Sequence, residues 1–496
     1  MATFAAVDLG AQSGRVAVGR FDGERLSATE VHRFPNTPVR TRGTLHWDIL
    51  RLYHEVLEGL RAAGREAGRV DSVAVDSWGV DFGLVDRRGR LVQNPVHYRD
   101  GRRARAMERV LEQVPARELY ERTGIQLMPI NTVFELGAMA GEDDPALAAA
   151  DTLLLIPDLV HFWLCGVRTS ELTNASTTQC FDPRSGGWAV DLLERLDVPA
   201  RLLPEVVRPG TRLGALDVDV AADTRLGAAA VVAAATHDTG SAVAAVPFRR
   251  PGSAFVSAGT WSLVGVETDE PVISDAAFAA NLTNEAGVNG TFRLLRNVTG
   301  LWLVHECRRE WAREGHDYSF DQLVALAKQA PPLRSFIEPN DPAFVEPGDM
   351  PARVRAFCAH TRQAEPVEPG SVVRCILESL ALKHAQTVEL LAAVTGVPPR
   401  EIHVVGGGAQ NELLCRWTAD AAALPVHAGP EEATLYGNLL VQAMSLGEIG
   451  SPEEGRQLVA ASVAPTTYEP RESEAWSEAR ERFAAAVTLP TLEVQA

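Results

Sequence analysis

Cysteine is scarce in this chain of 496 residues, and the cysteines are not spaced as metal ligands usually are. The six cysteines are scattered and include no Cys-X-X-Cys pair; they are Cys165, Cys180, Cys307, Cys358, Cys375 and Cys415. This spacing argues against a zinc site. We expect reduced, packed thiols, as in a cytosolic protein. Cys358 and Cys375 flank a short Pro-containing loop, so a disulfide between them is the one pairing left open.

Long apolar runs and a basic leader are also missing. No stretch approaches the roughly 20 apolar residues that a membrane helix needs. The first ten residues, MATFAAVDLG, carry no basic residue and already include Asp8. That pattern is not typical of a signal peptide. The sequence therefore predicts a cytoplasmic protein that does not enter a membrane.

Positive charge is in deficit. The formal net charge is -18 and the sequence pI is about 5.2. An acidic surface argues against nucleic acid or an anionic membrane as the main partner. It does not exclude a phosphorylated ligand, which backbone N–H groups of a local loop can bind. A single core stops growing at roughly 250–300 residues, so this length favours two large domains.

The stretch from Val231 to Val243, VVAAATHDTGSAV, indicates a site. A buried strand is expected at its start and a helix behind its small polar segment. An acid beside a glycine at such a strand end is a common place for chemistry in α/β proteins. Asp238 is the candidate, and a helix N-cap is the competing interpretation for the same residue.

The order of predicted elements indicates an α/β fold with mixed sheets. Two strands, over residues 4–8 and 16–21, are joined by a glycine-containing turn and form a hairpin. An amphipathic helix is expected over residues 49–64 and a further strand over residues 70–75. The segment 247–252, rich in proline and charge, marks a domain boundary. Directly after it, residues 254–266 repeat the hairpin pattern, so both expected domains begin with a similar β-hairpin.

Three glycine-containing turns are candidate phosphate or nucleotide loops. Asp8 to Arg15 can wrap a phosphate, because its glycines admit the backbone and Arg15 offers a planar donor fork. Asp8 is placed to hold magnesium through water. Gly259-Thr260 occupies the matching turn of the second hairpin, and Gly406 to Gly408 follows a strand predicted over residues 402–405. An ordinary β-turn remains the alternative for each of the two hairpin loops.

The segment Trp78 to Phe82 mixes an aromatic ring, a glycine and an acid after a strand. Sugars bind to such mixtures, with an apolar platform below the ring and carboxylates that accept from hydroxyls. A core tryptophan with a capping Asp81 is the alternative. His237, next to Asp238, is expected to orient the substrate rather than to transfer a proton.

Taken together, these motifs resemble the FGGY family of carbohydrate kinases over nearly the whole chain. The segments that carry the resemblance are VDLGAQSGRV (7–16), DSWGVDF (76–82), YRD (98–100), TGIQ (123–126), Asn131-Thr132, TNASTTQ (173–179), THDTGSAV (236–243), SAGTWSL (257–263), NVTGLW (297–302) and VGGGAQN (405–411). The resemblance implies two actin-like ATPase domains of the ribonuclease H-like fold, with mixed β-sheets and flanking helices. It also implies that they close over sugar and ATP.

The family motifs imply roles residue by residue. Asp238 falls at the position of the catalytic base. Substrate contacts are implied or expected for Trp78, Gly79, Asp81, His237, Asp238, Thr239 and Asn297. ATP contacts are implied for Ala11, Gln12, Ser13, Gly14, Arg15, Thr260, His305 and Gly407. The sequence departs from the family pattern at Gln12 and Ala258, where serine is frequent, and at His305, where glutamine is frequent.

The expected domains are residues 1–246, for sugar and phosphate binding, residues 253–450, for ATP binding, and a helical tail at 451–496. The resemblance implies a magnesium-dependent transfer of the γ-phosphoryl group of ATP to a sugar hydroxyl. The elements WGVDF, HDT and SAGTWSL favour the branch of the family that acts on the C1 hydroxyl of L-rhamnulose, in L-rhamnose catabolism. L-fuculose or another ketose is the nearest alternative, and a non-catalytic actin-like nucleotide switch is an alternative of another class. Partners are expected to be the sugar and ATP, and the protein a monomer or homodimer.

Overall fold

The apolar N-terminal run forms β1 (Ala2–Leu9), which pairs antiparallel with β2 (Ser13–Phe21) in a computed structural model of the protein. The described residues are 2–248, 250, 252–471 and 474–487. Arg249 and Pro251, within the predicted domain boundary, lie outside them. The chain divides into two compact units. The first comprises residues 1–247, 267–294 and 432–463, and the second comprises residues 248–266, 295–431 and 464–496.

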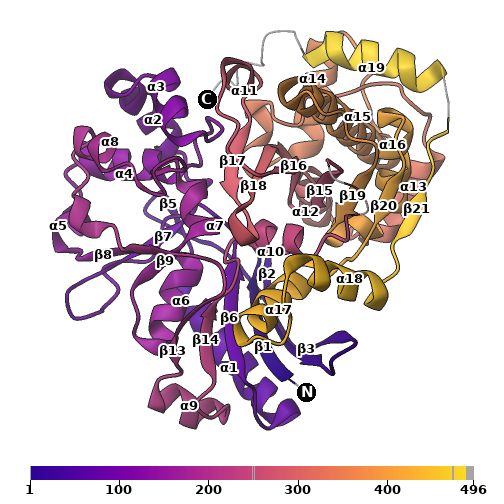
Figure 1. Ribbon diagram of the computed structural model, residues 1–496. Helices are drawn as coiled ribbons and strands as arrows, with labels where there is room; N and C mark the ends of the chain where they lie inside the picture. The colour runs from indigo at the N-terminus through magenta and orange to yellow at the C-terminus, as the bar shows by residue number, and fades with distance from the viewer. Residues whose placement is uncertain (1, 249, 251, 472–473, 488–496) are drawn as a thin grey trace. The chain divides into compact units, whose positions relative to one another are not determined.

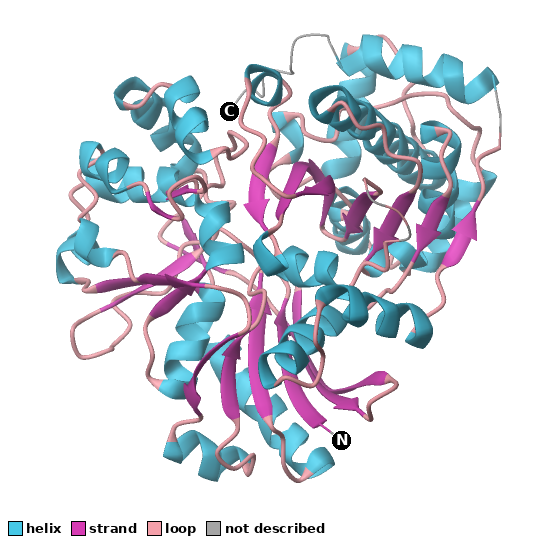
Figure 2. Ribbon diagram, in the orientation of Figure 1, coloured by secondary structure: helices cyan, strands magenta, loops and turns pink. Residues whose placement is uncertain are grey.

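A six-stranded mixed sheet forms the centre of the first unit (Figures 1 and 2). Its order is β13-β14-β6-β1-β2-β3, with β3 at Leu26–Pro35, β6 at Ser72–Ser77, β13 at Thr211–Ala215 and β14 at Ala230–Ala233. The strands β1, β6 and β14 run parallel, and β2, β3 and β13 pair antiparallel to their neighbours. The predicted mixed sheet is confirmed.

Helices cover this sheet and form a lobe beside it. The helices of the first unit are α1 (Ile49–Ala67), α2 (Arg102–Gln113), α3 (Ala116–Thr123), α4 (Thr132–Gly141), α5 (Pro145–Ala149), α6 (Ile156–Cys165), α7 (Leu172–Ala175), α8 (Val190–Arg195), α9 (Val218–Thr224), α10 (Asp238–Ala244), α11 (Asp275–Ala279), α17 (Ala433–Leu446) and α18 (Pro452–Ser462). Its further strands are β4 (Val39–Thr41), β5 (Thr44–His46), β7 (Phe82–Val85), β8 (Thr152–Leu155), β9 (Thr169–Glu171), β10 (Phe181–Asp182), β11 (Gly187–Trp188), β12 (Glu205–Val207) and β17 (Thr283–Ala286).

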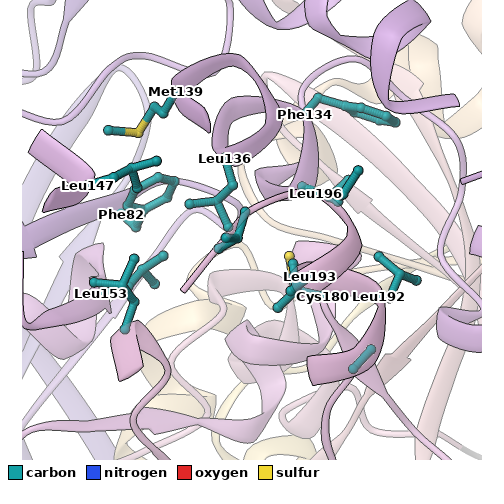
Figure 3. Packing of buried hydrophobic residues seen from close by; sticks show 14 of the residues in the cluster. Phe82, Phe134, Leu136, Met139, Leu147, Leu153, Cys180, Leu192, Leu193 and Leu196 are labelled. Carbon is teal, nitrogen blue, oxygen red and sulfur yellow. The ribbon is translucent and has the colours of Figure 1, made fainter. Parts of the chain in front are cut away.

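An apolar cluster joins α4, α5 and α8 to β7 and β8 (Figure 3). Phe82, Leu136 and Leu153 each expose 6% or less of their surface. Burying each such side chain stabilises the fold by about 1.5–3 kcal/mol. This cluster anchors the segment that follows β6, because Phe82 ends the motif that begins at Asp76.

The sheet of the second unit has the order β18-β16-β15-β19-β20-β21. Its strands are β15 (Ala254–Ala258), β16 (Trp261–Thr268), β18 (Phe292–Thr299), β19 (Ile402–Val405), β20 (Val426–Ala428) and β21 (Thr466–Tyr468), and its helices are α12 (Trp302–Arg313), α13 (Phe320–Gln329), α14 (Met350–His360), α15 (Pro369–Thr395), α16 (Glu412–Ala422) and α19 (Glu474–Val487). The division between the units falls inside β16 and β18. The segment 451–487 contains a strand, β21, besides two helices.

The two sheets repeat one strand order. Strands β3-β2-β1-β6-β14 of the first unit correspond in sequence order to β18-β16-β15-β19-β20 of the second. In both, an antiparallel hairpin comes first and its first strand then pairs parallel with a strand far along the chain. The similarity of the two hairpins in the sequence therefore reflects a repeated fold.

All six cysteines carry free thiols, and five of them are buried. Cys358 and Cys375, the pairing that the sequence left open, are both among these free thiols. None of the described helices combines the length and the apolarity required to cross a bilayer.

Candidate active site

Parallel strands bring three acidic positions to one edge of the first sheet. Asp8 at the end of β1 is in register with Asp76 on β6, and Ser77 forms a parallel bridge with His237, which precedes Asp238. Carboxyl ends of parallel strands are where α/β folds place their chemistry. Figure 1 shows β1, β6 and β14 side by side. The arrangement concentrates negative charge that a cation or a cationic side chain must balance.

Asp238 is the first residue of α10, and His237 takes the N-cap position. The N-cap interpretation of Asp238 is therefore not supported. Its Oδ1 accepts from the backbone N–H of Thr239 at 2.5 Å and from the Thr239 hydroxyl at 3.1 Å. The side chain is 30% exposed, so a ligand can reach it. Burial raises the pKa of this carboxyl and Asp8 adds to the shift, whereas His237 opposes it.

Asp76 begins the motif DSWGVDF, but the sequence does not assign a role to it. It is fully buried, and its Oδ2 accepts from Asn438 Nδ2 of α17 at 2.6 Å. Its Oδ1 has no hydrogen-bond partner among the described residues. Burial raises the pKa of Asp76 well above its usual range, and the carboxylates of Asp8 and Asp238 raise it further.

Arg15 joins the first hairpin to the start of α17. Its Nε and Nη2 lie 2.9 Å from Asp8 Oδ2, and its Nη1 pairs with Glu432. Desolvation opposes the charge, but these two carboxylates outweigh it and the pKa of Arg15 is raised. The predicted phosphate-binding arginine thus holds two carboxylates in this structure, and only 15% of its side chain is exposed.

The turn between β1 and β2 holds the other predicted residues of the first loop: Ala11, Gln12, Ser13 and Gly14. The Gly10 N–H donates to Ser13 O at 3.0 Å, and Asn36 fastens the turn through Gly10 O and Gln12 O, each at 2.9 Å. A Cβ at position 14 would lie 2.3 Å from the Phe34 ring, so any other residue there would have to displace this ring. The turn is a rigid loop with its backbone held in place.

Asp81 lies inside an aromatic cluster and does not face a ligand. It is 0% exposed; its Oδ2 accepts from Trp47 Nε1 at 2.6 Å and Trp78 Nε1 at 3.0 Å, and its Oδ1 accepts from Arg103 at 2.5 Å. N–H donors of the protein engage both oxygens of Asp81, which agrees with the alternative of a core tryptophan beside a supporting Asp81, and the direct contact of Asp81 with the sugar stays a prediction. Its position suits it to orient the two indole rings, whose centroids lie 4.1 Å apart.

Gly79 and Val80 form the turn after β6. A Cβ at Gly79 would lie 2.9 Å from Thr177 Oγ1. Val80 has a φ of 67°, which is rare for a β-branched residue. The Val80 N–H donates to the Thr177 hydroxyl at 3.2 Å, and the Thr132 hydroxyl donates to the Val80 carbonyl at 2.6 Å. Two threonines therefore hold a strained turn, and strain of this kind concentrates at functional sites.

The remaining predicted residues belong to the second unit. Thr260 lies in the turn between β15 and β16, where its carbonyl accepts from Gly300 and Trp302 N–H at 3.1 and 3.2 Å. Asn297 lies on β18, and its carbonyl accepts from Asn340. His305 on α12 stacks with Phe320. Burial, with Arg308 and Arg309, lowers the pKa of His305 to about 4.

Gly407 begins the loop after β19. No atom lies within 4 Å of the Cβ it would carry, whereas a Cβ at Gly408 would lie 2.4 Å from that of Ala258. Gly406 has a φ of 80°. The loop thus needs glycine at 406 for its conformation and at 408 for its packing, and it leaves 407 open.

Sequence reasoning also missed the buried charges around His237: Glu171, Glu285 and Arg293. Glu171 accepts from the backbone and hydroxyl groups of both Thr173 and Thr236. Arg293 within the apolar start of β18 was an available signal, because a charged residue is rarely buried unless paired. Glu171 and Glu285 lie in short polar strands, TSE and TNEA, which gave no such signal. In the described part of the chain, no group of three His, Cys, Asp or Glu side chains is arranged to hold a metal ion.

Each unit has the ribonuclease H-like strand order with a glycine turn in its first hairpin, so the fold defines a doubled, actin-like ATPase. Sequence models of the FGGY family of carbohydrate kinases match the N-terminal domain at residues 3–245 and the C-terminal domain at residues 254–446. The chain belongs to the FGGY family of carbohydrate kinases. It is therefore a carbohydrate kinase of the phosphotransferase class, as predicted.

Curated relatives match along their whole length. The rhamnulokinase of Bacteroides thetaiotaomicron is 42% identical over 480 residues, which cover 97% of this chain and 98% of that protein. The rhamnulokinase of Enterococcus faecalis is 39% identical over 470 residues, 94% of each chain. The rhamnulokinase of Bacillus subtilis is 36% identical over 469 residues, which cover 95% of this chain and 96% of that protein.

Solved structures share the fold at low identity. A ligand-bound xylulose kinase from Lactobacillus acidophilus matches with a TM-score of 0.80 and 15% identity, over 98% of this chain and 97% of that one. A Plasmodium falciparum glycerol kinase with ADP matches with a TM-score of 0.78 and 13% identity, over 98% of both chains. The predicted two-domain actin-like fold is confirmed.

Proposed function

We propose that this chain transfers the γ-phosphoryl group of ATP to the C1 hydroxyl of L-rhamnulose in the cytoplasm, as a step of L-rhamnose catabolism. The observation that carries the substrate is the identity of 36–42% to three rhamnulokinases over nearly the whole chain. No feature of the site favours L-fuculose, another ketose or a non-catalytic switch.

Asp238 is the proposed base. Its Oδ1 is engaged by Thr239, which leaves Oδ2 to accept the proton of the attacking hydroxyl. In a loose phosphoryl-transfer transition state the proton leaves late, so a carboxylate is basic enough. Gly79, Thr239 and His237 lie around this acid at the end of the sheet, and with Trp78 and Asn297 they are the proposed substrate contacts.

The two hairpin turns are the proposed phosphate loops. The backbone of residues 11–15 is fixed by Asn36, and fixed N–H donors stabilise phosphoryl charge without reorganisation. Thr260 and Gly407 are proposed to contact ATP from the second unit, residues 253–450, and His305 with them. The first unit is proposed to bind the sugar.

The acids at the end of the first sheet support a proposed magnesium site, in which described side chains would supply fewer than three ligands. Asp8 is 11% exposed and Asp76 has a buried oxygen without a partner, and oxygen donors of this kind suit a hard cation. We propose that Asp8 holds the ion through water. When bound, the ion would neutralise charge on the transferring phosphoryl group.

The first test is ADP release measured with L-rhamnulose and L-fuculose at equal concentration. We expect a strong preference for L-rhamnulose and a phosphate ester at C1. The Asp238→Asn variant should keep sugar and ATP binding but lose about 10²- to 10⁴-fold in kcat, because it cannot take up the proton.

Equal rates with both sugars, or a preference for L-fuculose, would move the substrate while the chemistry stands. No sugar-dependent ADP with either one, or with a panel of ketoses and polyols, would contradict the kinase assignment. Near-normal turnover of Asp238→Asn would remove Asp238 from its role as base.

A further inference from the structure

Arg293 on β18 is a fully buried cation close to the proposed base, in the same unit. Its Nε and Nη2 donate to the carbonyl of Ala286 at 3.2 and 2.9 Å, and its Nη1 lies 3.2 Å from Glu285 Oε2. A buried guanidinium is costly unless it is paired and bonded, and these contacts satisfy it. They also fix its remaining N–H donor in one direction.

That direction leads to the ring of His237. Arg293 Nη1 lies 3.2 Å from His237 Nδ1 with hydrogen-bonding geometry. A guanidinium can only donate, so this contact is a hydrogen bond when Nδ1 presents a lone pair to it. A neutral imidazole with a lone pair on Nδ1 carries its proton on Nε2.

The other end of the ring agrees with this assignment. His237 Nε2 lies 3.5 Å from Asp238 Oδ1, the oxygen that Thr239 already engages. An Nε2–H directed there faces the carboxylate and attracts it electrostatically, at a distance longer than a normal hydrogen bond. A lone pair directed there would face the lone pairs of a carboxylate, which is unfavourable in a buried site.

Glu285 supplies the competing arrangement. Its Oε2 also lies 3.2 Å from His237 Nδ1, so a proton on Nδ1 would bond to Glu285 instead. In that case Nε2 would hold the lone pair that opposes Asp238. The contacts at both ends of the ring therefore favour the arrangement in which Arg293 donates and Glu285 balances the charge of Arg293.

We propose that Arg293 is a positioning residue that fixes His237 in its Nε2–H tautomer, so that the polar N–H of the imidazole faces Oδ1 of Asp238 and Oδ2 is left to accept the substrate proton. The inference rests on the proposed role of Asp238 as the base. The tautomer can be measured without turnover, so its failure and the failure of the proposed function are distinguishable.

The direct test is ¹⁵N NMR of the wild-type protein labelled at histidine. The signals of His237 are identified by their loss in His237→Gln. We expect a protonated Nε2 and an unprotonated Nδ1 in the ligand-free protein at pH 7. A protonated Nδ1, with either the other neutral tautomer or an imidazolium, would overturn the proposal.

Arg293 variants separate positioning from simple stabilisation. In Arg293→Met we expect His237 to lose its fixed tautomer and kcat to fall roughly 10- to 100-fold, because a displaced group costs this much in a catalytic geometry. The KM for ATP should hardly change. Arg293→Lys keeps one cationic N–H donor, so it should recover part of the Nε2–H tautomer of His237 and part of kcat.

The matched control is Arg374→Met, which removes an arginine of α15 paired with Glu378 at 2.7 Å in the second unit. It should leave the His237 signals and kcat unchanged. An Arg293→Met protein that folds with lower stability but keeps the Nε2–H tautomer would reduce Arg293 to a structural residue and overturn the proposal.

A second pair of variants tests the geometry without changing Arg293. His237→Gln can place an amide N–H near the position of Nε2, whereas His237→Asn reaches only the position of Nδ1. We expect kcat of His237→Gln to exceed that of His237→Asn about tenfold, since only the longer side chain can donate to Asp238. Equal kcat values, or the reverse order, would contradict the proposed donor.

Discussion

Two aspartates of the predicted sugar pocket, Asp238 and Asp81, have different surroundings in the structure. Asp238 keeps one oxygen available and 30% of its side chain exposed. Asp81, which belongs to the same predicted pocket, has both oxygens occupied by N–H groups and is wholly buried. Burial raises the pKa of Asp81, which Arg103 and the indole N–H groups oppose. One side chain is the proposed proton acceptor, and the other binds the N–H groups of two indole rings.

Asp81→Asn tests this supporting role. The amide keeps the shape but removes the charge beside buried Arg103, and its NH₂ must face N–H donors. We expect the free energy of unfolding to fall by about 3 kcal/mol, because breaking a buried ion pair leaves a charge uncompensated. Urea unfolding measures it, and the KM for the sugar should rise as the indoles lose their anchor.

The control is Asp86→Asn, which removes a surface pair with Arg90, whose side chain is 70% exposed. Exposed pairs contribute about 0–1 kcal/mol. Equal losses of stability in the two variants would show that the carboxylate of Asp81 is not needed in its buried site.

At the scale of elements, α17 and α10 approach so closely that the helices touch through backbone. A Cβ at Gly437 of α17 would lie 1.7 Å from the Ser241 carbonyl oxygen of α10. Asn438, the next residue, bonds to Asp76, and Asp238 begins α10. This glycine therefore sets the distance between two helices that carry site residues.

We expect Gly437→Ala to destabilise the first unit by about 3 kcal/mol or more, because a backbone atom cannot move aside as a flexible side chain can. Sugar-dependent turnover should fall as well, since α10 must shift. Gly187→Ala is the control, because nothing lies within 4 Å of its added Cβ. Thermal unfolding and kcat are measured for both variants. A Gly437→Ala protein with the melting temperature and kcat of the wild type would contradict the close approach of α17 and α10.

At the scale of the molecule, each unit buries a histidine that the catalytic proposal does not use. His161 on α6 accepts from the Val75 N–H at 3.0 Å, and His384 on α15 bonds to Thr418. Burial lowers the pKa of each to about 3. Each histidine stays neutral in the folded protein, whereas in the unfolded chain it takes up a proton below pH 6.5. Acid therefore favours the unfolded chain, and the stability present above pH 6.5 is lost as the pH falls towards the folded-state pKa.

We therefore expect the free energy of unfolding to fall between pH 7 and pH 5 by about 2 kcal/mol for each of these histidines. His384→Asn should remove its share of that loss, whereas His316→Asn, at an exposed position, should not. Urea unfolding at both pH values gives the comparison. An unchanged pH dependence in His384→Asn would show that His384 is not buried as a neutral group.

The sequence by itself determined the elements and the places where chemistry is expected. Helix α1, both hairpins and the acid that follows β14 were predicted from local patterns, because residue spacing and glycine turns act within a few residues. The order of motifs also indicated the carbohydrate kinase family. The roles of Asp238, the two loops and magnesium remain predictions.

Only the tertiary structure decided which charged groups face each other. Asp76 meets Asp8 and Asn438, Asp81 meets Arg103, and Arg293 reaches His237 across 56 residues of sequence. Local sequence cannot give these pairs, because strand order and helix packing bring distant residues together. The direct sugar contact predicted for Asp81 stays a prediction for this reason: whether a carboxylate faces a ligand or the core depends on partners elsewhere in the chain.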